Sequence, residues 1–289
     1  MKEIVKPKLL IGLAVFFLVI ILLLFVATPM QLAWGMWGLA ATEIMILAAA
    51  VIPALLYKWD LKQVFPLGIP STRQVFGVLM LWLGSYLVVT TISLIIIYFF
   101  PQGLPEISRS ILELFQSTPF PVTLFIAAVM PAVCEEALHR GLIQYTFGPQ
   151  KKWVLVVVMG FIFGLFHLDP YRFLGTAILG AVMTLIMVET NNLVLPALFH
   201  FVNNAVSTFA SYQAEPPVAT DVAVPLVFIG AFLIITAVAP FLLVAGNRLL
   251  KSKATRETKA GKKTDILAAV AAAVLLFIAG VAITATTLP

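Results

Sequence analysis

The chain has 289 residues and a net charge of +5; 62% of its residues are hydrophobic and only 11% are charged. Soluble domains carry about 25% charged residues, so this composition excludes a soluble globular protein. The single cysteine, Cys134, excludes an intrachain disulfide or a site built from several thiolates. The positive charge does not indicate a nucleic-acid partner, because the basic residues follow a pattern typical of membrane topology.

Apolar runs recur along the whole chain, and each approaches the ~20 residues with which a helix crosses the hydrocarbon layer. They lack the alternation typical of membrane β-barrels. We therefore expect an all-α fold, a polytopic transmembrane helical bundle of eight or nine helices that forms a single membrane domain over residues 1–289. The expected spans are 9–26, 39–57, 75–100, 122–145, 153–168, 173–188, 193–212, 222–243 and 266–285. The first run is longer than the core of a cleaved signal peptide, so we expect the mature protein to retain it.

The Lys and Arg residues predict the orientation of the spans. With a cytoplasmic N-terminus, all but three of the 18 lie in cytoplasmic segments; Arg109 and Arg172 lie outside and Arg140 lies within a helix. This distribution satisfies the positive-inside rule in every loop. We expect an integral, multi-pass protein of a prokaryotic cell membrane, with a basic cytoplasmic linker at 246–265 before the final helix at 266–285. Helical spacing of apolar residues in the outer loop, 101–121, predicts a short surface helix.

Ionisable side chains inside membrane spans cost at least ~2.5 kcal/mol each, which makes them candidates for a functional site. They concentrate in one part of this chain. The fourth span contains Glu135, Glu136, His139 and Arg140, the fifth ends at His167, and the seventh contains His200, Asn203 and Asn204. Counted along the helices from their cytoplasmic ends, Glu135, His167, His200 and Asn204 lie roughly 10 to 21 Å deep. Three helices thus bring polar groups to similar depth, and we expect an intramembrane polar cavity there.

Helical phase separates the roles of these residues. Glu136 and Arg140 stand at i,i+4, a spacing that favours a salt bridge, while Glu135 points about 100° away and is left to act as a general base. His200 and Asn204 also stand at i,i+4, and an imidazole beside a carboxamide can donate two hydrogen bonds to one oxyanion. Polar residues that only hold helices together are the structural alternative.

These residues resemble the motifs of the CAAX-protease and bacteriocin-processing family of intramembrane proteases. The matching elements are Glu135-Glu136 with Arg140, Phe163 with His167, and His200 with Asn204. The resemblance covers 122–212, which we take as the catalytic core. It implies an all-helical membrane bundle with a cavity that opens to the cytoplasm and the membrane. It also implies an endopeptidase in which Glu135 and His167 activate water while His200 and Asn204 stabilise the oxyanion. Glu136 and Arg140 are expected to support them.

Whether a metal takes part stays open at the level of sequence. Glu135, Glu136, His167 and His200 could supply the ligands of a catalytic zinc ion. The chain has no His-Glu-x-x-His helix, however, and Arg140 would oppose a divalent cation, so we favour a route without cofactor. The expected partners are the lipid bilayer and a membrane-associated peptide or protein, either a prenylated carboxyl terminus or a leader peptide.

Two other functions are compatible with buried Glu and His residues. A transporter or channel could use them as an ion or proton relay, although the chain shows no paired half-repeat. A family member without activity could serve as a scaffold or immunity protein. Glu43, in the second span, is deep enough to be costly, and we expect it to bridge helices outside the catalytic set.

Overall fold

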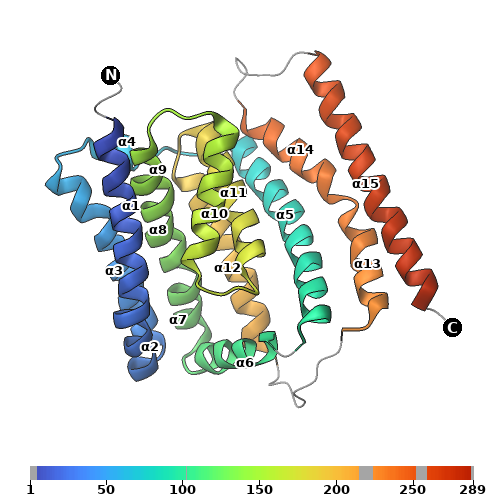
Figure 1. Cartoon of the computed structure of the whole chain (residues 1–289), viewed down its shortest axis with the longest axis horizontal. Helices are drawn as coiled ribbons and strands as arrows, with labels where there is room; N and C mark the ends of the chain where they lie inside the picture. The colour runs from blue at the N-terminus through green and yellow to red at the C-terminus, as the bar shows by residue number, and fades with distance from the viewer. Residues whose placement is uncertain (1–4, 102, 215–223, 252–258, 288–289) are drawn as a thin grey trace.

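The computed structural model describes residues 5–101, 103–214, 224–251 and 259–287, and the side chains of 8–101, 109–214, 224–251 and 263–287 (Figure 1). Every regular element in these ranges is a helix, so the all-α fold class is confirmed. The first half of the chain forms α1 (Val5–Leu22), η1 (Leu23–Ala27), α2 (Thr28–Trp34), α3 (Met36–Leu56), α4 (Leu61–Val64), α5 (Thr72–Phe99) and α6 (Gly103–Gln116). The second half forms α7 (Phe120–Leu124), η2 (Phe125–Val129), α8 (Met130–Glu136), η3 (Ala137–Ile143), α9 (Gln144–Phe147), α10 (Lys152–Phe166), α11 (Phe173–Thr190), α12 (Val194–Gln213), α13 (Leu226–Thr236), α14 (Ala239–Leu250) and α15 (Lys259–Thr287).

A helix lies within each of the nine expected spans, and the described residues contain seven helices long and apolar enough to cross a membrane. The protein is therefore an integral multi-pass membrane protein. The two expected spans outside these seven differ for separate reasons. The first, α10, is apolar but only 15 residues long. The second, α12, has 20 residues, but its polar side chains lower its hydropathy.

Several boundaries differ from the prediction. The first span continues through a π-helical turn, η1, as far as Trp34. The eighth is split between α13 and α14, and it ends at Leu250 rather than at residue 243. Helix therefore occupies residues 246–250 and 259–265 of the expected linker, which is shorter than predicted; residues 252–258 lie outside the described ranges. The linker carries basic residues near both of its ends, so its sequence did not indicate that these turns are helical.

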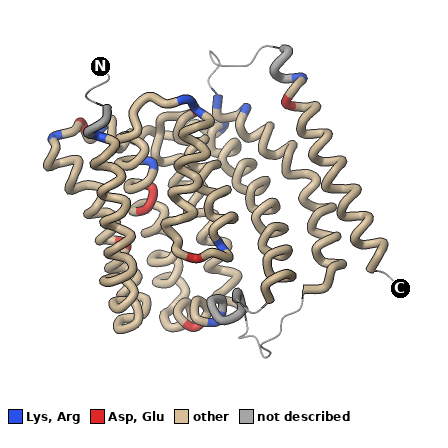
Figure 2. Tube along the Cα trace, in the orientation of Figure 1, with Lys and Arg blue, Asp and Glu red and all other residues tan. Residues whose placement is uncertain are grey.

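Lys and Arg residues gather at the end of the bundle where the N-terminus lies (Figure 2). We call this end the basic face. It follows from the helix bounds that the described Lys and Arg residues of this face are Lys8, Lys58, Lys62, Arg73, Lys151, Lys152, Arg248, Lys251 and Lys263. The surface helix expected in the outer loop is α6, which lies across the opposite end of the bundle (Figure 1).

Small residues bring the central helices close together. A Cβ added at Gly160 would lie 2.7 Å from the carbonyl oxygen of Ala177, and one added at Gly164 would lie 2.9 Å from the Cβ of Ala177. Membrane helices commonly use such small residues spaced four apart, because apolar side chains gain little from leaving lipid. The pair sets α10 directly against α11, and it thereby fixes the position of Phe163 and His167 beside α11.

Candidate active site

The fourth span is irregular where it carries the candidate residues. Two π-helical segments, η2 and η3, flank α8, and such segments are frequent at functional sites. Pro131 has no N–H with which to reach the carbonyl of Ala127 four residues earlier. The Nδ2 amide of Asn204 donates to that carbonyl oxygen instead, at 3.3 Å. A proline in one helix thus creates the acceptor that orients Asn204 on another.

Glu136 is the centre of the polar contacts. Its Oε1 atom accepts one hydrogen bond from Nη1 of Arg140 at 2.8 Å and faces Nδ1 of His200 at 2.9 Å. Glu136 is fully buried and Arg140 is 1% exposed. The predicted pair at i,i+4 is present, and it also holds a third residue from α12. Since Nδ1 of His200 donates to this carboxylate, the lone pair of the imidazole is on Nε2.

Phe163, the aromatic residue of the second motif, contacts Arg140 and two of the histidines. The guanidinium carbon of Arg140 lies 4.4 Å from the centroid of its ring. The rings of His167 and His200 approach it edge-on, with centroids at 4.8 and 5.7 Å. Arg140 also donates from Nη2 to the carbonyl oxygen of Gly180, at 2.8 Å. Gly180 leaves room for the Phe163 side chain, because an added Cβ would lie 2.7 Å from the Cβ of Phe163.

Glu135 lies next to His200, not next to His167. Its Oε2 atom is 3.9 Å from Nε2 of His200 and has no hydrogen bond in the described structure. Glu135 is 8% exposed. No described hydrogen bond or ion pair joins it to His167, with which the family pattern associates it. The structure therefore pairs the general-base candidate with the histidine from α12.

A cavity of about 290 Å³ collects three of the four catalytic candidates: His167, His200 and Asn204. Its walls come from α5, α10, α11 and α12. Nδ1 of His167 is held by the carbonyl oxygen of Phe163 at 2.9 Å, which leaves Nε2 for a ligand. Glu135 does not line this cavity, and it borders the cavity only through its neighbour His200. The four predicted residues are thus in one region but not around one point.

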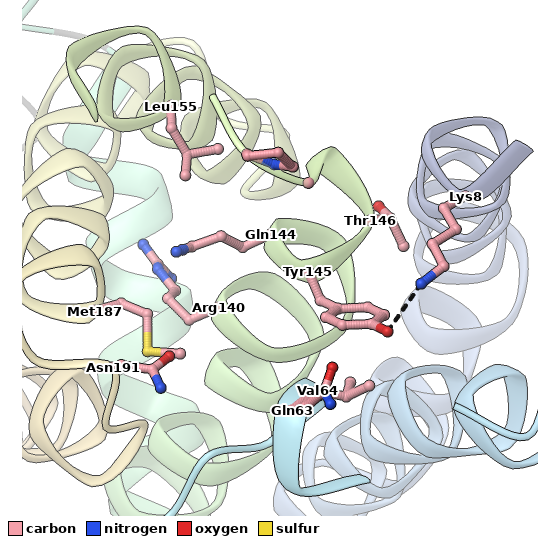
Figure 3. Close-up of a pocket in the computed structure, with 12 residues that line it drawn as sticks. Lys8, Gln63, Val64, Arg140, Gln144, Tyr145, Thr146, Leu155, Met187 and Asn191 are labelled. Atoms are coloured by element: carbon pink, nitrogen blue, oxygen red, sulfur yellow. Dashed lines mark hydrogen bonds between the residues drawn. The ribbon is translucent and has the colours of Figure 1, made fainter. Parts of the chain in front are cut away.

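A second cavity, of about 400 Å³, lies on the other side of Arg140, toward the basic face (Figure 3). It is lined by Arg140, Gln144, Met187 and Asn191, with Lys8 near its edge. Lys8 donates to the hydroxyl of Tyr145 at 3.0 Å. The buried Glu136–Arg140 pair therefore stands between a cavity with the histidines and a cavity toward the basic face.

Comparison with known proteins supports the reading of these motifs. Residues 117–206 match the family model described as type II CAAX prenyl endopeptidase, Rce1-like. The expected resemblance is confirmed for this segment. Neither the curated proteins nor the solved structures gave a match. The Rce1-like segment contains all six candidate residues, and it supports assignment as a CAAX-protease-like endopeptidase.

The Rce1-like site does not fit the zinc site that the sequence left open. Among the described residues, no three His, Cys, Asp or Glu side chains are arranged to hold a metal ion. Oε1 of Glu136 is already shared by a guanidinium and an imidazole, and Arg140 places a positive charge beside the carboxylates. Oε1 of Glu136 is thus already occupied by two protein contacts.

Three further residues lie near the Rce1-like motifs: His139 and Glu43, which the sequence marked as ionisable residues within spans, and Gly180, which it did not mark. His139 is fully buried between the rings of Phe163 and Phe166, and its Nδ1 faces the backbone oxygen of Glu135 rather than the carboxylate. Gly180 supplies the carbonyl oxygen that accepts from Arg140 and the space that the Phe163 side chain needs. Glu43, on α3, is 3% exposed, and its Oε2 atom has no hydrogen bond in the described structure. Its charge in the second span marked Glu43 from sequence, as a residue expected to bridge helices outside the catalytic set.

Proposed function

We propose that the protein is an intramembrane endopeptidase that hydrolyses peptide bonds of membrane-associated peptides or proteins with a water activated by Glu135 and without a metal. The observation that carries the proposal is a series of contacts in which Arg140 binds Glu136 and Glu136 binds His200. These contacts direct Nε2 of His200 toward Oε2 of Glu135, at 3.9 Å. Two acceptors at this separation can both receive hydrogen bonds from one water molecule. The expected substrate classes are prenylated carboxyl termini and leader peptides.

Glu136 acts by orienting His200. A carboxylate that accepts from one imidazole nitrogen fixes the tautomer and the ring plane, as in triads where the acid holds the base. Arg140 compensates the buried charge of Glu136, and its own position is fixed by Gly180 and Phe163. Neither residue needs to touch the substrate, so we assign both as positioning residues.

Glu135 is assigned to proton transfer. As the water oxygen attacks the carbonyl carbon of the peptide bond, a proton passes from the water to Glu135, and negative charge develops on the carbonyl oxygen. When the C–N bond breaks, Glu135 returns that proton to the leaving amine. A buried carboxylate suits this cycle, because it is weakly solvated and can exchange a proton with a bound water. His200 holds the water on the opposite side from Glu135.

Asn204 is assigned to the oxyanion. Its amide nitrogen donates one hydrogen bond to Ala127, so the group is already oriented and has a second N–H for the substrate. Its Oδ1 accepts from Nδ2 of Asn203 at 3.3 Å, which fixes the amide against rotation. Nε2 of His167 offers an acceptor on the same cavity for an N–H of the bound peptide. Thus the roles of the two cavity histidines differ from those implied by the family pattern.

The test is cleavage of a membrane-anchored peptide library by purified protein in liposomes, followed by mass spectrometry. Glu135→Gln should lower the cleavage rate by about 10²- to 10⁴-fold, the usual contribution of a general base. Glu189→Gln is the matched control, since Glu189 pairs with Lys152 on the basic face. Undiminished cleavage by Glu135→Gln would contradict the mechanism, and no cleavage by the parent protein would support the inactive-scaffold alternative.

Metal dependence has a separate readout in the same assay. We expect cleavage to continue after treatment with a strong chelator, and elemental analysis of the purified protein to find less than one zinc per chain. Loss of cleavage on chelation, with recovery on addition of zinc, would overturn the metal-free route and leave the endopeptidase assignment in place.

A further inference from the structure

Glu43, on α3, is a buried acidic residue that the proposed mechanism does not use. Its side chain is 3% exposed, and its Oε2 atom has no hydrogen bond. Among the described residues, no hydrogen bond or ion pair joins this carboxyl group to another helix. An ionisable residue inside a membrane span is costly, and such residues are kept where they have a partner in a functional site. Glu43 therefore requires a partner on one of the helices around α3.

The part of α3 that carries this residue packs against the fourth span. Ile44, the next residue, lines an apolar groove together with Met130. Ile46, three residues further on, belongs to the same buried cluster as Cys134. The α3 carboxyl group is thus within about one helical turn of the depth of Glu135, which follows Cys134. The two carboxyl groups are close enough to interact electrostatically.

The other titratable groups around α3 do not offer a partner. Of the elements packed most closely against α3, η1, α2 and η2 carry none, and α1 and α4 carry only lysines, at the basic face. On α8 and η3, Glu136 pairs with Arg140, and His139 lies between two aromatic rings of α10. The thiol of Cys134 is a weak acceptor. Glu135 remains, and its Oε2 atom also has no hydrogen bond.

One proton satisfies both of these carboxyl groups. An isolated carboxylate is strongly disfavoured away from water, and two carboxylates in one place repel each other, so only one of the pair is ionised. A neutral carboxyl group has one O–H donor, and a carboxylate has only acceptors. We propose that Glu43 and Glu135 share one proton, with Glu43 as the donor, and that Glu43 is a positioning residue for Glu135. The O–H group of Glu43 then supports the ionised form of Glu135 and orients it.

This role rests on the proposed function, because Glu135 is its general base. In the resting pair Glu43 holds the proton, and Glu135 is free to accept one from the attacking water. After that transfer both carboxyl groups are neutral, and return of the proton to the leaving amine restores the pair. A hydrogen bond to a carboxylate is stronger than one to a neutral acid, so the O–H group of Glu43 favours this return. Glu43 needs no contact with the substrate.

Infrared spectroscopy tests the shared proton without any cleavage. The C=O stretch of a neutral carboxyl group is separate from the bands of carboxylates and amides, and it shifts when its hydrogen-bond partner changes. Spectra are recorded for purified protein at neutral pH, in H2O and D2O, in a detergent without ester groups. The variants are Glu43→Gln and Glu135→Gln. Glu189→Gln is the matched control, since Glu189 pairs with Lys152 on the basic face.

We expect the parent and the control to show one band of a neutral carboxyl group. Glu43→Gln should lack this band, because it removes the residue that holds the proton. Glu135→Gln should keep the band at a shifted frequency, because the O–H group then donates to an amide rather than to a carboxylate. No band in the parent, a band that survives in Glu43→Gln, or a band that Glu135→Gln leaves unshifted would overturn the shared proton.

The pH dependence of cleavage tests the positioning role. Glu43→Leu fills the space without a donor, so the ionised form of Glu135 loses its support and a higher pH is needed to reach it. We expect this variant to move the acid limb of the kcat/KM profile upward by about one pH unit, which is a loss of about tenfold on that limb. Glu43→Gln, whose amide still donates, should move the limb less. A purely structural role would leave the position of the limb unchanged.

Thr42→Val is the matched control on α3. Thr42 is 2% exposed, donates to the carbonyl oxygen of Gly38 and accepts from Gln31. We expect this variant to keep the acid limb of the parent. An unmoved limb in Glu43→Leu, or an equal shift in Thr42→Val, would overturn the positioning role. If the parent cleaves no peptide while the infrared band behaves as expected, the proposed endopeptidase fails and the shared proton stands.

Discussion

The fourth span and the last helix show how differently one membrane protein uses its apolar segments. Both Phe120–Phe147 and Lys263–Thr287 are apolar enough to cross the bilayer. Their environments are opposite. In the most apolar 18-residue stretch of the fourth span, 61% is buried inside the protein, against 11% in that of the last helix. The fourth span carries the acidic pair and Arg140, whereas the membrane part of α15 presents apolar side chains to lipid.

The difference follows from where polar groups find partners. Lipid offers no hydrogen bonds, so each polar side chain at that depth must be matched by another helix. In the fourth span, neighbours on α11 and α12 supply those partners. At the edge of the bundle, α15 packs against α13 and α14 (Figure 1). Changes in the fourth span should therefore affect both stability and cleavage, while changes in α15 should affect stability alone.

The largest effect on stability is expected from Arg140→Met. The substitution keeps the apolar volume and leaves Glu136 buried beside His200 without its cation, and removal of one partner of a buried ion pair typically costs ~3–5 kcal/mol. We expect a lower thermal midpoint in detergent and loss of cleavage, measured by thermal unfolding and by the peptide assay.

Glu189→Gln is the control for that loss, because the Lys152–Glu189 pair is partly exposed and should contribute at most ~1 kcal/mol. An Arg140→Met protein as stable as this control would show that Glu136 does not need a cation.

Asn204→Ala should affect cleavage more than stability. Removal of one donor to an oxyanion lowers kcat by about 10²- to 10³-fold in enzymes that depend on it. The variant also leaves the carbonyl of Ala127 without its donor, at 3.3 Å, which is a small loss for a weak hydrogen bond. Steady-state kinetics separates the two roles, since a fall in kcat with little change in thermal midpoint is expected. An equal effect from Asn203→Ala would argue against a specific role.

Gly180→Ala is expected to have an intermediate effect on both properties. Its new methyl group would lie 2.7 Å from the Cβ of Phe163, so the ring must move away from Arg140 at a cost of ~1–3 kcal/mol. Because the same ring contacts His167 and His200, we expect cleavage to fall as well. Unchanged cleavage would mean that Phe163 packs the helices without orienting the site.

The fold was largely predictable because hydropathy and charge are local properties of the sequence and do not depend on which helices pack together. All nine spans and the surface helix α6 follow from runs of apolar residues and from the basic loops. Boundaries at Trp34 and Leu250 were missed, since a helix can continue past the hydrocarbon region wherever its side chains tolerate the interface. The π-helical turns beside α8 were also unpredictable, because they depend on contacts with other helices.

The candidate site was predictable in its members and less so in its pairing. Buried charge in three spans identified Glu135, Glu136, Arg140, His167, His200 and Asn204, and the structure brings them into one region. Helical phase correctly anticipated the Glu136–Arg140 salt bridge. It could not reveal that His200 contacts both glutamates, or that Asn204 takes the carbonyl freed by Pro131, because such contacts are set by rotation and approach between helices.

The smallest effect on function is expected at the edge of the bundle, from Gly280→Ala. This glycine is the counterpart of Gly180, since an added Cβ would lie 2.7 Å from the carbonyl oxygen of Gly230 on α13. The methyl group should push α15 away from α13 and lower the thermal midpoint, as Gly180→Ala does. Cleavage should stay within about two-fold of the parent, because distant sites without shared partners behave independently. A parallel loss of cleavage would show that the outer helices and the site are coupled, and would remove the distinction between the two regions.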